Sequence, residues 1–206
     1  MIRKFLIYLK KSLLPRPPEL FLLEMIFPTN NLSTLKLPEL PSNYKLRIFR
    51  EGDLKDFNNL LIKAEMGICR LEYWQNHILP NGFFVIEDTD TSELVATFFA
   101  SHHPANRHPH AGNLGWLAVD PAHRGNNLGS VVVISVMNRL LNAGYKRIYL
   151  ETHQFRLPAI NIYLKLGWIP FIYRPEMNEQ WELISSKLKY PFTPHQWEII
   201  AKNSEF

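Results

Sequence analysis

The chain has 206 residues, enough for one ordinary domain with a packed core and some tens of residues besides. Hydrophobic residues make up 46% of it and charged residues 20%, a composition that excludes intrinsically disordered and collagen-like proteins. The formal net charge of +4 is modest and spread along the sequence, which argues against a nucleic-acid-binding protein.

The first 43 residues differ in composition from the rest. Residues 1–14 place basic side chains around an apolar run that is too short to span a bilayer. We favour a helix packed on the domain or on a partner chain over a basic amphipathic helix lying on anionic lipid. Prolines recur through residues 15–41 and argue against long regular structure, so this stretch is interpreted as a linker or wrapped arm.

Regular structure is expected from the end of this arm onward. Residues 44–50 alternate in polarity, as a half-buried first strand does. Apolar residues at helical spacing predict a helix over 53–66, and a short helix is expected over 70–77. Two strand-like runs, 83–87 and 94–101, flank a polar turn and predict a hairpin.

A strand, a loop, a helix and a second strand then follow in order. Residues 114–119 form an apolar strand, and the loop at 124–129 leads into a helix that is closed by Gly144. The strand at 147–151 comes directly afterwards. This order is a crossover connection, so the two strands should be near-parallel neighbours.

The loop at 124–129 is a candidate anion site. It lies between a strand end and a helix start, where unpaired backbone N–H groups and the helix dipole converge. Glycine lets a backbone approach phosphate oxygens closely. The alternative is a glycine-bearing turn that only connects strand to helix.

Two motifs give the sequence a family resemblance. Residues 119–129 resemble the central motif of the GNAT N-acetyltransferase superfamily, with Arg124 in its first place and Gly129 in its last. Asn127 stands where the middle glycine usually lies, and Asn tolerates the left-handed backbone region better than other non-glycine residues. Residues 156–168 are similar to the family segment that ends in Tyr, any residue, Lys, Leu, Gly and an aromatic residue.

The resemblance covers residues 44–188 and implies an α/β GNAT fold, with a central mixed, mostly antiparallel sheet flanked by helices. Its fourth and fifth strands are expected to be parallel and splayed. We therefore divide the chain into an N-terminal basic helix and Pro-rich arm (1–43), an acetyltransferase domain (44–188) and a C-terminal tail (189–206). The implied activity is transfer of an acetyl group from acetyl-CoA to an amine, by direct attack in a ternary complex.

Acetyl-CoA would bind in the splayed gap, its pantetheine arm along the fourth strand and its pyrophosphate on the loop. The implied binding residues are Leu117, Ala118, Val119, Arg124, Gly125, Asn126, Asn127, Leu128, Gly129 and Ser130.

Tyr163 fills the tyrosine place of the second motif and is the candidate general acid for the departing thiolate. The place of the glutamate that serves as base in some relatives is taken by Asn113, which cannot act as a base. Glu151, His153 and His110 remain candidates for that role, and we put Glu151 with Tyr163 as the catalytic pair.

Other features set the limits of the interpretation. The single cysteine, Cys69, cannot form an intrachain disulfide, which favours a reducing, cytoplasmic setting. The histidines between 102 and 110 lack the spacing of a metal site, so no metal is expected and a loop lining the acceptor mouth is favoured. The runner-up function is a GNAT-fold module that binds acyl-CoA or a partner without turnover. The sequence selects neither the amine acceptor nor the oligomeric state, for which a homodimer is one option.

Overall fold

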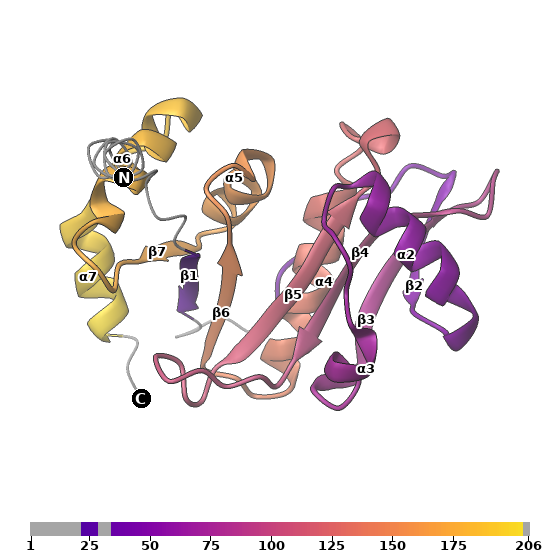
Figure 1. Ribbon diagram of the computed structural model, residues 1–206, viewed down its shortest axis with the longest axis horizontal. Helices are drawn as coiled ribbons and strands as arrows, with labels where there is room; N and C mark the ends of the chain where they lie inside the picture. Colours follow the sequence, from indigo (N-terminus) through magenta and orange to yellow (C-terminus); the bar gives the residue numbers. More distant parts are fainter. Residues whose placement is uncertain (1–21, 29–33, 204–206) are drawn as a thin grey trace, which may run out of the picture.

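One mixed sheet of seven strands organises the chain (Figure 1). The computed structural model describes residues 22–28 and 34–203. Across the sheet the strands run in the order β2-β3-β4-β5-β6-β1-β7, and only the β5–β6 pair is parallel. The strands are β1 (Leu23–Pro28), β2 (Tyr44–Ile48), β3 (Ile78–Asp88), β4 (Leu94–Ser101), β5 (Gly112–Val119), β6 (Arg147–Thr152) and β7 (Ile169–Phe171). The predicted fold class is confirmed.

Helices cover both faces of this sheet. They are α2 (Leu54–Lys63), α3 (Leu71–Trp74), α4 (Leu128–Asn142), α5 (Leu157–Lys165), α6 (Met177–Leu188) and α7 (Pro194–Asn203). In Figure 1, α2 lies in front of the strands β3 to β5 and α4 lies behind them. The predicted helices, the hairpin and the parallel crossover are confirmed, with ends that shift by a few residues.

The strand β1 corrects the interpretation of residues 15–41 as an arm without regular structure and of residue 44 as the start of the first strand. It lies inside the sheet, antiparallel to β6 on one side and to β7 on the other. Residues 23–27 are all buried, because protein covers both faces of the sheet here. A strand buried on both faces lacks the polar–apolar alternation that marks a half-exposed one, so the surrounding prolines dominated the pattern.

Two hydrophobic clusters hold the layers together. The larger one joins α4, α5 and α6 to the sheet and includes the fully buried Trp168 and Trp181. The smaller one lies on the opposite face, where Phe57 and Leu61 of α2 pack against Phe99 of β4. The sheet is therefore covered on both faces at β4 and β5. This packing holds β5, the strand that borders the site described below.

The C-terminal tail also packs on this core. Trp197 of α7 is 4% exposed and meets the Trp181 ring edge-on at 6.2 Å. The division of the chain at residues 44 and 188 stays a prediction, although β1 and α7 contribute to the same core cluster as the strands between them. The helix expected over residues 1–14 lies outside the described residues, and no described helix combines the length and apolar character needed to cross a membrane.

Replacing Ile26 by alanine tests the place of β1 in the core. Ile26 is fully buried, so Ile26→Ala should lower the free energy of unfolding by about 2–5 kcal/mol. The matched control is Leu22→Ala, just outside the strand and 41% exposed, which should cost less than about 1 kcal/mol. Urea denaturation measures both, and equal costs would contradict a buried β1.

Candidate functional site

The parallel strands β5 and β6 separate soon after they meet. They pair only at Gly112, Asn113 and Leu114, opposite residues 148–150. Figure 1 shows the two strands close together at one end and diverging toward the other. From Gly115 onward, the edge of β5 that faces β6 has no strand partner among the described residues. This edge can pair with an extended ligand.

A bulge in β5 accompanies the separation. The pairing with β4 shifts register between Thr97 and Phe99, and Trp116 adopts a left-handed backbone with φ of 65°. This conformation is costly for a bulky aromatic residue and is found mostly where the surrounding structure imposes it, often at functional sites. Bulges bend a strand and increase its twist, so this one helps to carry β5 away from β6.

The predicted anion loop lies at the end of β5 and opens α4. Asn127 is the residue at the helix start, with φ of 62° and ψ of 7°, and Gly125 has φ of 89°. Asn127 thus adopts the left-handed conformation, which asparagine tolerates better than other non-glycine residues. Its side chain makes no capping hydrogen bond, and the first N–H groups of an α-helix have no partner within the helix. The loop therefore presents backbone donors and the positive end of the α4 dipole.

Side chains hold this loop from behind. Asn126 Nδ2 donates to the Tyr44 hydroxyl at 3.2 Å and to the His123 carbonyl at 3.1 Å. The Tyr44 hydroxyl also lies 3.0 Å from His123 Nδ1, so β2 and the loop share one hydrogen-bonded cluster. The Asn126 side chain is thus turned to the protein, and the backbone of the loop is left for a ligand.

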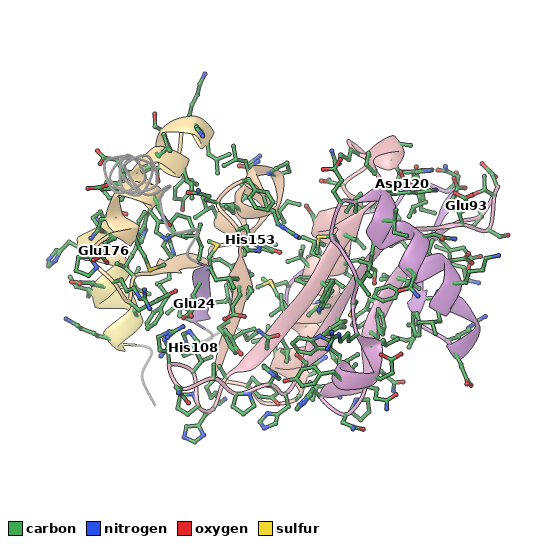
Figure 2. The ribbon with its side chains drawn as sticks, in the orientation of Figure 1. Glu24, Glu93, His108, Asp120, His153 and Glu176 are labelled. Carbon is green, nitrogen blue, oxygen red and sulfur yellow. The ribbon has the colours of Figure 1, made fainter. Side chains whose placement is uncertain are left out.

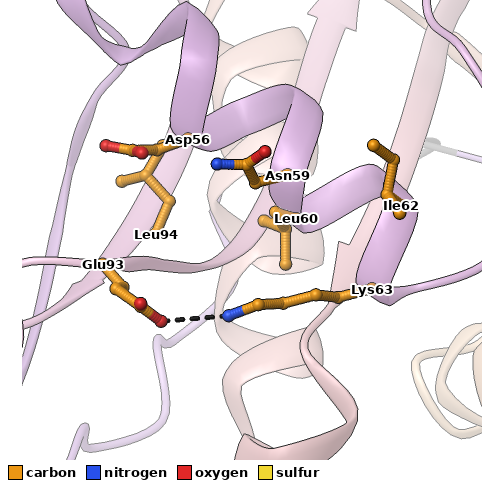
Figure 3. A pocket seen from close by; sticks show the side chains of 7 residues that line it. All are labelled: Asp56, Asn59, Leu60, Ile62, Lys63, Glu93 and Leu94. Atoms are coloured by element: carbon orange, nitrogen blue, oxygen red, sulfur yellow. Dashed lines mark hydrogen bonds and ion pairs between the residues drawn. The ribbon is translucent and has the colours of Figure 1, made fainter.

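Asp120 fixes the chain just before the loop. Its Oδ1 accepts from Ala122 N at 2.9 Å, and its Oδ2 pairs with Lys63 of α2 at 3.0 Å. Lys63 also bonds Glu93 at the same distance, in the hollow of Figure 3. The lining residues of that hollow are Asp56, Asn59, Leu60, Ile62, Lys63, Glu93 and Leu94. Because two carboxylates already match the charge of Lys63, the hollow is not an anion site.

Helix α5 carries the predicted acid, Tyr163, and packs beside the loop. A Cβ built at Gly129 would lie 2.9 Å from Cδ1 of Ile162, so the start of α4 lies directly against α5, and the Ile162 side chain would have to shift for any larger residue at position 129. Tyr163 is 4% exposed, and its ring lies 5.8 Å from that of Trp168. Burial raises the pKa of Tyr163, so the phenol keeps its proton at neutral pH.

Glu151, the predicted base, is the first residue of β6 beyond its last pair with β5. By strand alternation it shares a face with Tyr149, which pairs with Asn113 of β5. The Glu151 side chain is exposed to solvent. Even so, desolvation by the surrounding protein and the neighbouring carboxylate of Glu24 raise the pKa of Glu151, which favours a base that works near neutral pH.

The other two candidate bases lie elsewhere. His153 follows β6 and stacks on Phe155, with ring centroids 5.1 Å apart, and its pKa is lowered by burial and by Arg156. His110 is exposed on the loop before β5. Asn113 is buried and accepts a hydrogen bond from the Ser101 hydroxyl at 3.2 Å. Of the three candidates, Glu151 alone combines a raised pKa with a place at the separation of β5 and β6.

The side chains of Tyr73, Trp74 and His103 form an aromatic wall that the sequence did not predict. Trp74 of α3 contacts Phe99 at 5.4 Å and His103 at 4.8 Å between ring centroids. The Tyr73 hydroxyl lies 2.9 Å from His103 Nε2, and the Tyr149 hydroxyl donates to the His103 carbonyl. The histidine-rich loop is therefore joined to α3 and to β6, which no local pattern could reveal.

The family model of the GNAT acetyltransferases matches residues 49–168 of this chain, more than half of its length. The chain belongs to the GNAT acetyltransferase family. Both family motifs and the separating strands lie within the matched segment.

Similar proteins agree at the level of the family. The mycothiol acetyltransferase of Nocardia farcinica is 27% identical over 156 residues, which cover 68% of this chain and 50% of that protein. The mycothiol acetyltransferase of Saccharomonospora viridis is 28% identical over 146 residues, 64% of this chain and 47% of that protein. The chain thus spans about half the length of the curated relatives it matches.

A crystal structure of a GCN5-related N-acetyltransferase from Sphaerobacter thermophilus superposes with a TM-score of 0.61 at 17% identity. The match covers 82% of this chain and 53% of that one, and at this identity it supports the fold alone. Within the described part of this GNAT chain, no group of three or more His, Cys, Asp or Glu side chains is placed to hold a metal ion.

Two substitutions at position 127 test the strained loop. Asn127→Gly should keep or raise the free energy of unfolding, since glycine adopts a positive φ without a steric penalty. Asn127→Val should lower it by about 1–2 kcal/mol, because a β-branched side chain resists the left-handed region. Thermal and urea denaturation compare the two variants, and a valine variant as stable as the glycine variant would rule out the left-handed conformation.

Proposed function

We propose that this chain transfers an acetyl group from acetyl-CoA to an amine acceptor by direct attack in a ternary complex. The observation that carries the proposal is the combination of two features at one end of the sheet. The parallel pair of β5 and β6 ends at Leu114, and the strand β5 then leads into a helix start with left-handed residues at Gly125 and Asn127. Such a site offers a strand edge to an extended arm and N–H groups to a pyrophosphate.

The proposed contacts with acetyl-CoA lie along β5 and continue in the loop that follows it. The free edge at Leu117, Ala118 and Val119 pairs with the pantetheine arm, and residues 124–130 hold the pyrophosphate. Because the donors of the loop are backbone groups, Asn127 serves as well as glycine provided that its side chain stays outside the loop. Arg124 is exposed and adds a positive charge beside the phosphates.

Glu151 takes the proton of the amine in this proposal. The neutral amine attacks the carbonyl carbon of the thioester, the new C–N bond forms, and the C–S bond breaks. Desolvation and Glu24 bring the pKa of Glu151 above its ordinary value and so closer to that of a working base. The carboxylate also attracts the ammonium form of the acceptor before the proton is removed.

Tyr163 donates a proton to the departing thiolate. Its phenol is held in a nearly closed environment, where burial raises its pKa and keeps the proton in place until the thiolate forms. The net result moves one proton from the amine to the sulfur of CoA, and solvent exchange then restores Glu151 and Tyr163.

The acceptor is proposed only as a class. The curated relatives are named for mycothiol, but this chain spans half their length and is less than 30% identical to them, so we carry over acetyl transfer alone. The aromatic wall of Tyr73, Trp74 and His103, which is joined to β6 through Tyr149, suits an amine that carries an apolar or cationic body.

A GNAT-fold module without turnover is the second candidate. The amide Asn113, hydrogen-bonded to Ser101, favours it, because the place of a glutamate base in some relatives is filled by a residue that cannot take a proton. The two candidates share the binding site and differ in turnover, which the second of the following tests decides.

Calorimetric titration with acetyl-CoA tests the pyrophosphate site. Ser130→Glu places a negative charge in the first turn of α4, where it should repel the pyrophosphate and weaken binding by about tenfold or more. Ser130→Gln has nearly the same size without the charge and should bind as the wild type does. Equal affinities of the two variants would contradict phosphate binding at this helix start.

Release of the CoA thiol tests turnover, with spermidine, glucosamine, tryptamine and a tripeptide as acceptors. Tyr163→Phe and Glu151→Gln should each bind acetyl-CoA normally and slow transfer by about 10²–10⁴-fold. Wild-type transfer should fall as the pH drops through the raised pKa of Glu151, because the base takes up a proton. The rate of transfer by Glu151→Gln should not show this fall at low pH. Normal binding without thiol release by the wild type would support the module instead.

A further inference from the structure

We infer that Glu24, on the N-terminal strand β1, is a positioning residue that holds Arg107 away from Glu151 and so leaves the Glu151 carboxylate free to accept the amine proton. The inference deepens the proposed function and rests on it. Glu24 lies outside the segment that the family model matches, so the resemblance alone does not point to it.

Glu24 and Glu151 are direct cross-strand neighbours. The antiparallel register of β1 and β6 places them opposite each other, and such pairs have side chains on one face about 5 Å apart at Cβ. Two carboxylates in this arrangement repel each other, so one cation between them would be shared or captured. Whether the Glu151 carboxylate stays free therefore depends on which of the two carboxylates binds the cation.

Arg107 is the cation, and Glu24 captures it. Arg107 Nε donates to both carboxylate oxygens of Glu24 at 3.0 Å, and Arg107 Nη2 donates to Glu24 Oε1. The guanidinium also lies over the ring of Tyr173, 4.0 Å from its centroid. Two restraints therefore hold the Arg107 head at β1, although the side chain as a whole is 45% exposed. None of the described hydrogen bonds joins Arg107 to Glu151.

His108 keeps Glu24 in place from the interior (Figure 2). It is fully buried, and its Nε2 lies 3.0 Å from Glu24 Oε2. Its ring stacks on that of Tyr149 at 4.5 Å, and its Nδ1 has no hydrogen-bond partner in the described part of the chain. Burial lowers the pKa of His108, so the neutral ring donates from Nε2 and adds no charge.

The charged and titratable groups that face Glu151 come from four parts of the chain. They are Glu24 on β1, Arg107 on the loop between β4 and β5, and the phenols of Tyr149 on β6 and Tyr173 after β7. After desolvation, Glu24 raises the pKa of Glu151 and Arg107 lowers it. Despite burial, the bonds from His108 and Arg107 lower the pKa of Glu24, which therefore stays charged at neutral pH and keeps Arg107 bound.

A ¹³C NMR titration of the glutamate carboxyl groups tests the inference without an acceptor. The resonance of Glu151 is assigned by its loss in Glu151→Gln. In Glu24→Gln, the neighbouring negative charge is lost and Arg107 is also released toward Glu151, so the proton affinity of Glu151 should fall about three- to tenfold. In the Arg107→Gln background the same Glu24→Gln change removes only the charge, so it should lower the proton affinity of Glu151 by clearly less. In Arg107→Gln alone the proton affinity of Glu151 should rise, since the cation is removed. Glu182→Gln, on the exposed face of α6, is the control and should leave Glu151 unchanged.

A fall caused by Glu24→Gln that is larger with Arg107 present than in the Arg107→Gln background supports the inference, and equal falls, or no fall, would overturn it. If Glu24→Gln fails to fold, as judged by circular dichroism, Glu24→Asp takes its place: the shorter side chain keeps the charge but loosens its hold on Arg107, so the proton affinity of Glu151 should still fall. An unmoved Glu151 titration together with loss of transfer in Glu151→Gln contradicts the role of Glu24 only. Full transfer by Glu151→Gln contradicts the assigned base in the proposed function, and with it the role of Glu24.

Discussion

The site depends on one constraint, the interruption of hydrogen bonding between two parallel strands. β5 and β6 pair at three positions and then separate, while the bulge at Trp116 turns β5 and helices on both faces keep it in place. The backbone groups on the separated edge lose their strand partner and need another. In the proposed complex, a ligand with an extended amide-bearing arm satisfies them, and its phosphates bind at the helix start that follows β5.

The N-terminal strand extends this arrangement toward Glu151. β1 pairs with both β6 and β7 and so connects these strands into one sheet on the side of β6 away from β5. It also brings a charged residue into the interior, and that charge is tolerated because Arg107 and His108 satisfy it. Segments far apart in the sequence thus meet at Glu151: β1, the histidine-rich loop and the end of β6.

Much of this could be predicted from the sequence where the signal is local. The helix periods, the polar turn of the hairpin and the motif around Gly129 each occupy one short stretch, and the left-handed Asn127 follows from its place in that motif. What the sequence did not predict is non-local. The strand β1 is buried on both faces and lacks alternation, and the contact between Arg107 and Glu24 joins residues 83 positions apart. The aromatic wall likewise joins α3 to a loop and two strands.

Hydrogen–deuterium exchange with and without acetyl-CoA tests the central claim most directly. If the cosubstrate occupies the gap between β5 and β6, the amides of residues 115–119 and 125–130 should gain protection together, while those of the remote strand β2 should not change. Exchange that stays the same along β5 and the loop at saturating acetyl-CoA would contradict the account, because both the strand edge and the helix start would then lack the ligand they are proposed to bind.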